Sequence, residues 1–384
     1  MIFDPTPLST TEEELRGEVR AFLADVLPDD FRPGLGLGGR HDPEFTRTLA
    51  ARGWVGMSIP REYGGAGAGT VERFLVVEEL LAAGAPIVAH WIAERQTAPT
   101  LMRFGTEEQR RWFLPRIAAG ECWFSLGMSE PDAGSDLASV RTTATRVEGG
   151  WRVDGTKVWT TNAHLNHFFV VLCRTSTEPD RHAGLSQLIV DLAAEGVTVS
   201  PIPLLDGGRH VNQVVLDGVF VPDDRVLGQV GEGWAQVTAE LAHERSGPDR
   251  YLSVLGLLRS FLAAYGPALD DAAAAAVGRI CARLWTIRQL SLAVARALEQ
   301  GEAPAVEAAL VKDVGTTFEQ EVVEALRDVA GTEIDPEGET MFERLLAECV
   351  ANAPTWTLRG GTTEVLRGIA AKSLSAAIRS RGAR

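Results

Sequence analysis

Apolar residues recur every three or four positions through the first third of the chain, which predicts α-helices there. Each hydroxyl residue of Ser9-Thr10-Thr11 stands three residues before an acid of Glu12-Glu13-Glu14, a capping pattern that opens the first helix. The apolar positions of this helix are Leu15, Val19, Phe22, Leu23 and Val26. Pro28 is expected to end it. A second capping pair, Thr106 and Gln109, opens another helix.

The spacing changes to a strand pattern between about residues 140 and 216. Short runs rich in Val, Thr, Phe and Ile lie over residues 168–174, 185–191 and 211–217. Turn residues interrupt this region at Glu148-Gly149-Gly150 and at Asp154-Gly155. No helical segments alternate with the strands, which argues against a parallel, doubly wound sheet. The middle of the chain is therefore predicted to be an antiparallel β domain.

The last third returns to helical spacing after the turn at Gly231-Glu232-Gly233. One apolar stripe consists of Leu284, Ile287, Leu290, Leu292, Val294 and Leu298. A second stripe steps by four through Val306, Leu310, Val314, Phe318, Val322 and Leu326. Helices of this kind are expected to pack as a bundle. We therefore predict a helical domain over residues 1–120, a β domain over 121–230 and a helical bundle over 231–384.

Composition and charge are those of a folded globular protein and exclude several functions. The 384 residues are 45% apolar, and no segment approaches 18 consecutive apolar residues, so we expect no membrane partner. The 37 basic and 52 acidic side chains give a net charge of -15, which disfavours nucleic acid as a partner. The four cysteines are scattered and the N-terminus lacks a signal-peptide pattern, which predicts a reduced, cytoplasmic location.

Two segments match the sequence pattern of a binding site but lack the neighbouring elements or residues that such a site requires. The segment from Gly34 to Gly39 matches G-x-G-x-x-G, but it follows Pro33 and no helical stripe opens after it, so we expect no dinucleotide site there. His164 and His167 have the spacing of a metal pair, yet no carboxylate cluster accompanies them. We expect them to be loop histidines, and we predict no metal site in the chain.

The stretch from Phe124 to Asp136 carries the clearest chemical signal. Pro131 and the residues Ala133-Gly134-Ser135 predict a tight loop whose small side chains let backbone N–H groups and hydroxyls approach an anion or a planar ring. Such a loop suits a phosphate or the edge of a flavin. The same residues suit a plain glycine turn between a helix and a strand equally well, and the pattern alone leaves both interpretations open.

This stretch and the segment Gly155-Thr156-Lys157-Val158-Trp159-Thr160-Thr161-Asn162 resemble the two flavin-binding signatures of the acyl-CoA dehydrogenase family. Other segments agree in the same order, and the resemblance spans nearly the whole chain: residues 53–54, 60–65, 219–222, 228, 231–234, 244–245 and 360–365. It implies an α+β multidomain fold in which an N-terminal helical domain, a middle antiparallel β-barrel-like domain and a C-terminal four-helix bundle follow one another.

The resemblance also implies a non-covalent FAD between the β domain and the bundle, and α,β-dehydrogenation of an acyl-CoA thioester. The β-domain positions that would contact the flavin or the CoA are Leu126, Ser129, Gly134, Ser135, Trp159 and Thr161. The bundle positions that would reach the dinucleotide are Thr362, Thr363 and Glu364. The substrate-binding positions would be Ser135, Arg245 and Gly360, the last through its backbone N–H.

The catalytic base is where the chain departs from many family members. They carry a glutamate immediately before the terminal Gly-Thr signature, but this chain has Gly360 there, and glycine cannot remove a proton. In a branch that resembles isovaleryl-CoA dehydrogenase, the base comes from the helix that opens the bundle, at the position of Glu244. Glu244 is therefore the predicted base. A simple ion pair of Glu244 with Arg245 or another cation is the alternative.

Two motifs that close the flavin site of a neighbouring subunit in family homomers are missing here. The chain has residues 265–271 and 327–332 where these motifs are expected, and neither segment matches. This indicates a heteromer with a paralogous subunit, similar to the α2β2 acyl-CoA dehydrogenases of bacterial steroid side-chain catabolism, with a homomer as the alternative. The family implies electron-transferring flavoprotein as the acceptor. A non-catalytic partner subunit, or a flavin oxidase or monooxygenase of the same fold, are the rival functions.

Overall fold

The computed structural model describes residues 7–35 and 39–382, apart from the side chains of residues 240–244, 374 and 376–382. The chain divides into two compact units. The bundle unit comprises Met1–Arg40, Gly69–Ala85 and Ala242–Arg384, and the sheet unit comprises His41–Ala68 and Pro86–Leu241. Part of the G-x-G-x-x-G segment, residues 36–38, lies outside the described residues. No helix within the described ranges is long and apolar enough to cross a membrane.

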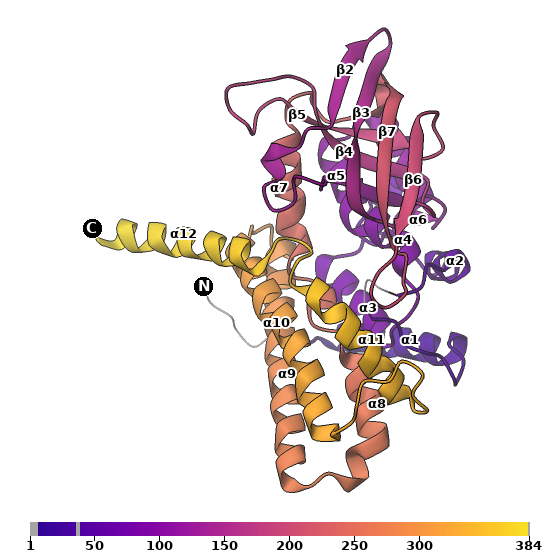
Figure 1. Cartoon of the computed structure of the whole chain (residues 1–384), viewed down its shortest axis with the longest axis vertical. Coiled ribbons are helices and arrows are strands. Elements are labelled where there is room, and N and C mark those ends of the chain that lie inside the picture. The colour runs from indigo at the N-terminus through magenta and orange to yellow at the C-terminus, as the bar shows by residue number, and fades with distance from the viewer. Residues whose placement is uncertain (1–6, 36–38, 383–384) are drawn as a thin grey trace. The chain divides into compact units, whose positions relative to one another are not determined.

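The bundle unit is built from helices only, over the part of it that the structure describes. Its helices are α1 (Thr10–Val26), α3 (Thr70–Ala82), η6 (Pro248–Arg250), α8 (Leu255–Tyr265), η7 (Gly266–Ala268), α9 (Asp271–Glu299), α10 (Ala305–Ala330), α11 (Met341–Trp356) and α12 (Thr363–Gly382). Helices α8 to α11 pack as the predicted four-helix bundle, and α12 contacts α10 and continues beyond it (Figure 1).

Ion pairs to one buried carboxylate join the first two helices of the bundle unit. Helix α1 begins with a capping box of the predicted kind, and of the three candidate pairs it is Ser9 and Glu12 that exchange hydrogen bonds between side chain and backbone. Glu79 of α3 accepts hydrogen bonds from Arg16 and Arg20 of α1, each guanidinium Nε lying 2.8 Å from a carboxylate oxygen. These contacts keep α1 against α3 while its apolar face, which includes Val19, Phe22 and Leu23, is buried.

The sheet unit combines short helices with one twisted sheet. Its helical elements are α2 (Pro43–Ala51), η2 (Arg61–Tyr63), α4 (Val88–Ile92), the π-helical turn η3 (Ala93–Thr97), α5 (Ala98–Phe104), α6 (Glu107–Ala118), η4 (Leu137–Ser139), η5 (Asp223–Arg225) and most of α7 (Gly233–Glu244). Helix α6 opens with the predicted capping box of Thr106 and Gln109.

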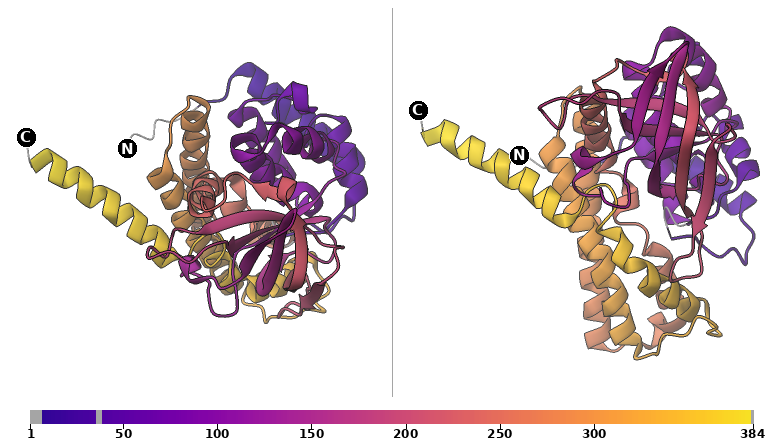
Figure 2. Two further views of the ribbon diagram at one scale, coloured as in Figure 1. Left: turned by 90° about the horizontal axis from the view of Figure 1, so that it is seen from above. Right: turned by 45° about the horizontal axis from the view of Figure 1, so that its top comes forward.

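The sheet of this unit is open, whereas the sequence predicted a barrel-like domain. Its strands are β1 (Phe124–Gly127), β2 (Thr143–Val147), β3 (Gly150–Thr161), β4 (Phe168–Arg174), β5 (Leu185–Asp191), β6 (Val197–Ile202), β7 (Val211–Pro222) and β8 (Val226–Leu227). Their order is β6-β7-β3-β2-β4-β5-β8, with β1 paired to β4 in parallel. Figure 2 shows the twist of the sheet from two further directions. Most other pairs are antiparallel, as predicted, but the two ends of this order do not pair, so the sheet does not close.

Strand β3 differs from the sequence expectation because it runs through Asp154-Gly155, where the sequence predicts a turn. The turn lies only at Glu148-Gly149, where β2 passes into β3. At Gly155 the register against β7 shifts, and it shifts again between Lys157 and Thr160. A glycine next to an aspartate thus marks an irregularity inside one long strand, not its end.

Candidate functional site

Strand β1 and the loop after it carry four of the predicted cofactor and substrate positions. Leu126 lies in β1 and is partly buried against the core around Phe124, while Ser129 follows it and is half-buried. Glu130 and Ala133 exchange two backbone hydrogen bonds, of 2.8 and 3.1 Å, which makes the tight turn that the sequence predicts. Gly134 and Ser135 follow this turn and are exposed. A Cβ atom added at Gly134 would meet nothing within 4 Å, so the backbone there is open to a ligand.

Strand β3 presents Trp159 from a bulge. Lys157 pairs with Val214 of β7 and Thr160 pairs with Asn212, so Val158 and Trp159 together face a single residue of β7. The backbone of Trp159 is left-handed, with a φ of 61°, and its side chain is 59% exposed. A bulky residue in this conformation is strained and is found where the surrounding structure imposes it, often at functional sites.

The two signature segments meet in the sheet unit. The N–H of Val158, which the bulge removes from the β3–β7 ladder, donates to the carbonyl of Ser129 at 3.0 Å. The hydroxyl of Ser125 in β1 donates to the carbonyl of Thr161 at 2.8 Å. Strand pairing and these hydrogen bonds therefore bring the Ser129–Ser135 loop to the same end of β3 as Trp159 and Thr161.

Helix α7 carries the predicted base as its last residue. Its first turns are fixed on the sheet, because Val237 is buried with Leu172 and Leu185 and the amide of Gln236 donates to the carbonyl of Leu227 at 3.0 Å. Glu244 ends the helix. The side chain of Glu244 lies outside the described residues, so its role stays a prediction.

In the bundle unit, the predicted bundle positions gather at the turn before α12. Gly360 and Gly361 both have left-handed backbones, with φ of 70° and 97°, which explains why glycine occupies both positions. Thr362 precedes the helix and its carbonyl accepts the N–H of Leu366 at 3.0 Å. Glu364 lies exposed in the first turn of α12, and hydrogen bonds from its own backbone N–H and from Thr362 lower its pKa.

Cations from two other segments hold this turn by its carbonyl groups. The buried guanidinium of Arg245 donates to the carbonyl of Gly360 at 3.3 Å. The fully buried ammonium of Lys312, in α10, donates to the carbonyls of Gly361 at 2.6 Å and Thr357 at 3.1 Å. Arg245 thus contacts the turn that contains Gly360, and its expected contact with the CoA portion of a substrate stays a prediction.

A second polar group, formed by Arg359, Ser253 and Glu319, lies next to the same turn. Arg359 donates to the hydroxyl of Ser253 at 3.3 Å and lies 4.0 Å from a carboxylate oxygen of Glu319. Glu319 is fully buried and accepts the N–H of Ser253 at 2.8 Å. Burial raises the pKa of Glu319 to about 7, against the lowering effect of Arg359 and Ser253. Arg359, which immediately precedes Gly360, therefore lies beside a carboxyl group whose pKa is about 7.

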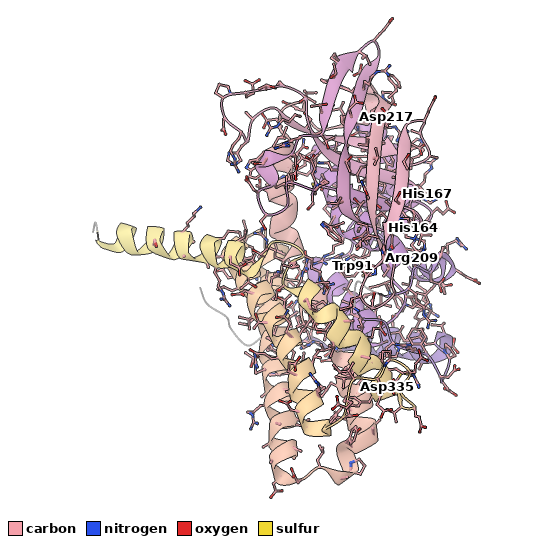
Figure 3. The ribbon with its side chains drawn as sticks, in the orientation of Figure 1. Trp91, His164, His167, Arg209, Asp217 and Asp335 are labelled. Carbon is pink, nitrogen blue, oxygen red and sulfur yellow. The ribbon has the colours of Figure 1, made fainter. Side chains whose placement is uncertain are left out.

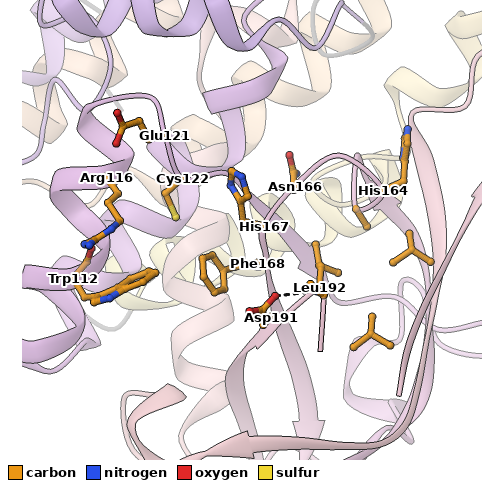
Figure 4. Close-up of a pocket in the computed structure, with 14 residues that line it drawn as sticks. Trp112, Arg116, Glu121, Cys122, His164, Asn166, His167, Phe168, Asp191 and Leu192 are labelled. Atoms are coloured by element: carbon orange, nitrogen blue, oxygen red, sulfur yellow. Dashed lines mark hydrogen bonds between the residues drawn. The ribbon is translucent and has the colours of Figure 1, made fainter. Parts of the chain in front are cut away.

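His164 and His167 lie in the turn between β3 and β4 and line a hollow of about 670 Å³ in the sheet unit (Figures 3 and 4). His167 accepts the backbone N–H of Trp123 at 3.1 Å through Nδ1 and stacks on its indole. Among the described residues, none of the predicted site positions lines this hollow, and no group of three or more His, Cys, Asp and Glu side chains could hold a metal ion.

Three residues of these two regions were given no role from the sequence. Lys157 and Glu130 form a buried ion pair of 2.8 Å between the two signature segments, and Lys312 holds the terminal turn. A compositional signal was available, because Lys157, Lys312 and Lys372 are the only lysines among 37 basic residues. Two of these three lysines, Lys157 and Lys312, are fully buried.

Three family models match the chain in order: the acyl-CoA dehydrogenase N-terminal domain over residues 9–121, the middle domain over residues 125–219 and the C-terminal domain over residues 263–375. A relative from Mycobacterium tuberculosis, acyl-CoA dehydrogenase FadE29, is 33% identical over 97% of this chain and 98% of its own length. The chain belongs to the acyl-CoA dehydrogenase family. Enzymes of this family are oxidoreductases that act on the CH–CH bond of acyl-CoA substrates.

One further relative and two solved structures refine this similarity. Acyl-CoA dehydrogenase IpdE1 of Mycobacterium tuberculosis is 42% identical over 61% of this chain and 63% of its own length. The Tcur3481-Tcur3483 steroid ACAD is 31% identical, with a TM-score of 0.85 over 96% of this chain and 98% of that chain. The ChsE4-ChsE5 complex from Mycobacterium tuberculosis is 30% identical, with a TM-score of 0.83 over 95% and 97%. Each of these structures carries a name that joins two proteins, and the second is described as a complex.

Proposed function

We propose that this acyl-CoA dehydrogenase chain is the FAD-binding, catalytic subunit of a heteromer and that Glu244 is its base. The observation that carries the proposal is the meeting of the two signature segments, where a strained, exposed Trp159 stands beside the Ser129 loop. A subunit with only a scaffolding role would have no need to maintain this strained arrangement.

The residues in the sheet unit fit a flavin. Trp159 offers an exposed aromatic face next to Ser129, and Gly134 leaves space for close approach to the backbone. The chain positions proposed to hold FAD are Leu126, Ser129, Gly134, Ser135, Trp159 and Thr161 in the sheet unit, and Thr362, Thr363 and Glu364 in the bundle unit. When bound, the flavin supplies the acceptor for the β-hydride of the acyl chain.

The remaining steps belong to side chains and backbone groups of this chain. Glu244 takes the α-proton of the thioester, for which it must reach the α-carbon in its carboxylate form. The backbone N–H of Gly360 donates to the thioester oxygen, where negative charge develops as the proton leaves. Arg245 and Lys312 donate hydrogen bonds to the carbonyls of this turn. These bonds fix the orientation of its N–H groups before the substrate binds.

A paralogous subunit in an α2β2 assembly is the proposed partner. The two segments that lack the homomer motifs form the end of α8 with η7, and the end of α10, where Gly331 caps the helix in a left-handed conformation. Large apolar side chains are also exposed in the bundle unit, with Trp285 of α9 at 60% and Val314 of α10 at 41%. Such side chains suit a subunit interface.

The relatives support a bulky, steroid-like acyl group as the substrate class, because two structures similar to this chain at 30% identity or more are a steroid ACAD and the ChsE4-ChsE5 complex. We also propose electron-transferring flavoprotein as the acceptor and a cytoplasmic location.

The direct test is to co-express the chain with a paralogous acyl-CoA dehydrogenase subunit and to add CoA esters without oxygen. We expect one FAD per heterodimer, and loss of the flavin absorbance with a bulky, branched or steroid-like acyl-CoA. A stable homo-oligomer with one tight FAD per chain would overturn the heteromer. Oxygen consumption with a substrate that is not a thioester would favour an oxidase or monooxygenase instead.

A further inference from the structure

Lys157 is a fully buried lysine in a chain with only three lysines. Its ammonium donates to the carboxylate Oε1 of Glu130 at 2.8 Å and to the carbonyl of Met128 at 3.1 Å. Both partners lie in the segment after β1, whereas Lys157 lies in β3. The lysine therefore links the two signature segments through hydrogen bonds made inside the protein.

Glu130 connects the same loop at its far end. Its Oε2 accepts the N–H of Arg141 at 2.6 Å, and its Oε1 accepts the N–H of Thr142 at 2.9 Å in addition to Lys157. The carboxyl group of Glu130, at the beginning of the loop, is thus bonded both to the end of the loop just before β2 and to Lys157 of β3. Burial pushes the pKa of Glu130 upward, but Lys157 and the donated hydrogen bonds outweigh it and hold the pKa below its ordinary value. The carboxylate is therefore ionised at neutral pH.

The ion pair lies immediately before the bulge that presents Trp159. Lys157 is the last residue of β3 in register with β7 before the shift, and the next N–H, that of Val158, donates to Ser129 at 3.0 Å. The ammonium of Lys157 thus fixes one side of the bulge through its hydrogen bonds to Met128 and Glu130. The carbonyl of Ser129 fixes the bulge itself by accepting the N–H of Val158. The left-handed backbone of Trp159 follows directly.

We propose that Lys157 and Glu130 are a pair of positioning residues that hold the Ser129–Ser135 loop and Trp159 in the relative placement required for flavin binding. This inference rests on the proposed function for its ligand, but the placement itself belongs to the chain without a ligand. A buried ion pair adds little net stability compared with apolar residues of similar volume, so a role in specifying geometry accounts better for its presence.

The deciding variant is the double substitution Lys157→Met with Glu130→Gln in the complex with the partner subunit. It removes both charges together, so no unpaired buried charge remains, and the amide oxygen of glutamine can still accept a backbone N–H. Arg146→Met with Asp223→Asn is the matched control, because this exposed ion pair joins β2 to η5 near the opposite end of β3. The single variants Glu130→Gln and Lys157→Met complete a cycle.

Hydrogen–deuterium exchange of residues 129–142 and 157–161 measures placement, and FAD dissociation measures its consequence. We expect the double variant to unfold within a few degrees of the unmodified protein, while exchange in both segments and the FAD dissociation constant rise at least tenfold. In the control variant, the exchange rates of both segments and the FAD dissociation constant should change by no more than twofold. Unchanged exchange and FAD affinity, or unfolding of the whole sheet unit, would overturn the inference. If the unmodified protein binds no FAD, the proposed function fails, and the exchange data still decide the role of the pair.

Discussion

Trp159 combines two features that rarely occur together at one residue, a bulky aromatic side chain and a left-handed backbone. At a φ of 61° a residue with a Cβ is strained, and the 59% exposure of the indole means that burial provides limited compensation. The hydrogen bond of the preceding residue, Val158, to Ser129 and the register shift against β7 impose the conformation. The strain is therefore local and can be relieved by one substitution.

Replacing Trp159 by glycine and by alanine separates backbone strain from flavin binding. Both variants lose the indole, so both should release FAD more easily, by tenfold or more. Glycine accepts a left-handed backbone whereas alanine does not, so Trp159→Gly should be about 1 kcal/mol more stable than Trp159→Ala in urea unfolding. Equal stability of the two variants would show that this bulge is not strained.

Glu319 gives the protein a specific dependence on pH. Burial raises its pKa to about 7 in the folded protein, compared with an ordinary value of 4.5. Between these two values the folded state binds more protons than the unfolded state, so the free energy of unfolding falls as the pH rises. The loss is complete above about pH 7, where Glu319 must remain buried as a carboxylate near Arg359 and Asp249.

Glu319→Gln should remove the fall in the free energy of unfolding that occurs as the pH rises toward 7. We expect the drop in unfolding free energy between pH 5 and pH 8 to be smaller in the variant by about 1–3 kcal/mol, as measured by urea unfolding at both pH values. Glu321→Gln is the matched control, because Glu321 is exposed two residues along the same helix and pairs with Arg283. Parallel curves for Glu319→Gln and the unmodified protein would contradict the assignment.

The sequence identified most of these residues by type and position, but not their surroundings. The small residues at 133–135 predicted a tight loop, and Glu130 and Ala133 form its turn. The left-handed Trp159 and the partner of Lys157 could not be predicted, because both depend on the register of β3 against β7 and on the path of a loop 27 residues earlier. Single-chain patterns contain no information on such pairings.

Among the elements, the terminal turn depends on α10 for its shape. Lys312 is buried in that helix and donates to the carbonyls of Thr357, just after α11, and Gly361, just before α12. Its ammonium also lies at the carboxyl end of α11, where the helix dipole favours a positive charge. Removal of the ammonium would leave two carbonyl groups without this donor.

Lys312→Met is therefore expected to lower the free energy of unfolding by about 2–3 kcal/mol and to reduce kcat/KM, because the turn that contains Gly360 loses its support. Chemical unfolding and steady-state kinetics of the complex measure the two effects. Lys372→Met on the exposed side of α12 should change stability by less than about 0.5 kcal/mol. Normal kinetics in Lys312→Met would show that the turn does not depend on this ammonium.

Helix starts were predicted better than helix faces and strand ends. The capping boxes at Ser9 and Thr106 are present as predicted, because a cap depends on residues three positions apart. The second apolar stripe was wrong at Val314, which is 41% exposed, since a step of four residues drifts around a helix with 3.6 residues per turn. The π-helical turn over residues 93–97 left no recognisable pattern in the sequence.

For the whole molecule, the order of helices, sheet and bundle follows from the change in apolar spacing along the chain, and the family confirms it. The open sheet could not be anticipated, because closure depends on whether β6 and β8 pair across the sheet. The boundaries at residues 120 and 230 stay a prediction, as do the individual site residues and the paralogous partner.

The central claim is that Glu244, and no residue at position 360, removes the α-proton. The most direct measurement is the rate at which acyl-CoA reduces the flavin of the complex without oxygen, in the unmodified protein, in Glu244→Gln and in Glu240→Gln, one helical turn earlier in the sequence. We predict that Glu244→Gln keeps its FAD but is reduced at least a hundredfold more slowly, whereas Glu240→Gln stays within about twofold. Reduction of Glu244→Gln at the unmodified rate would contradict the account.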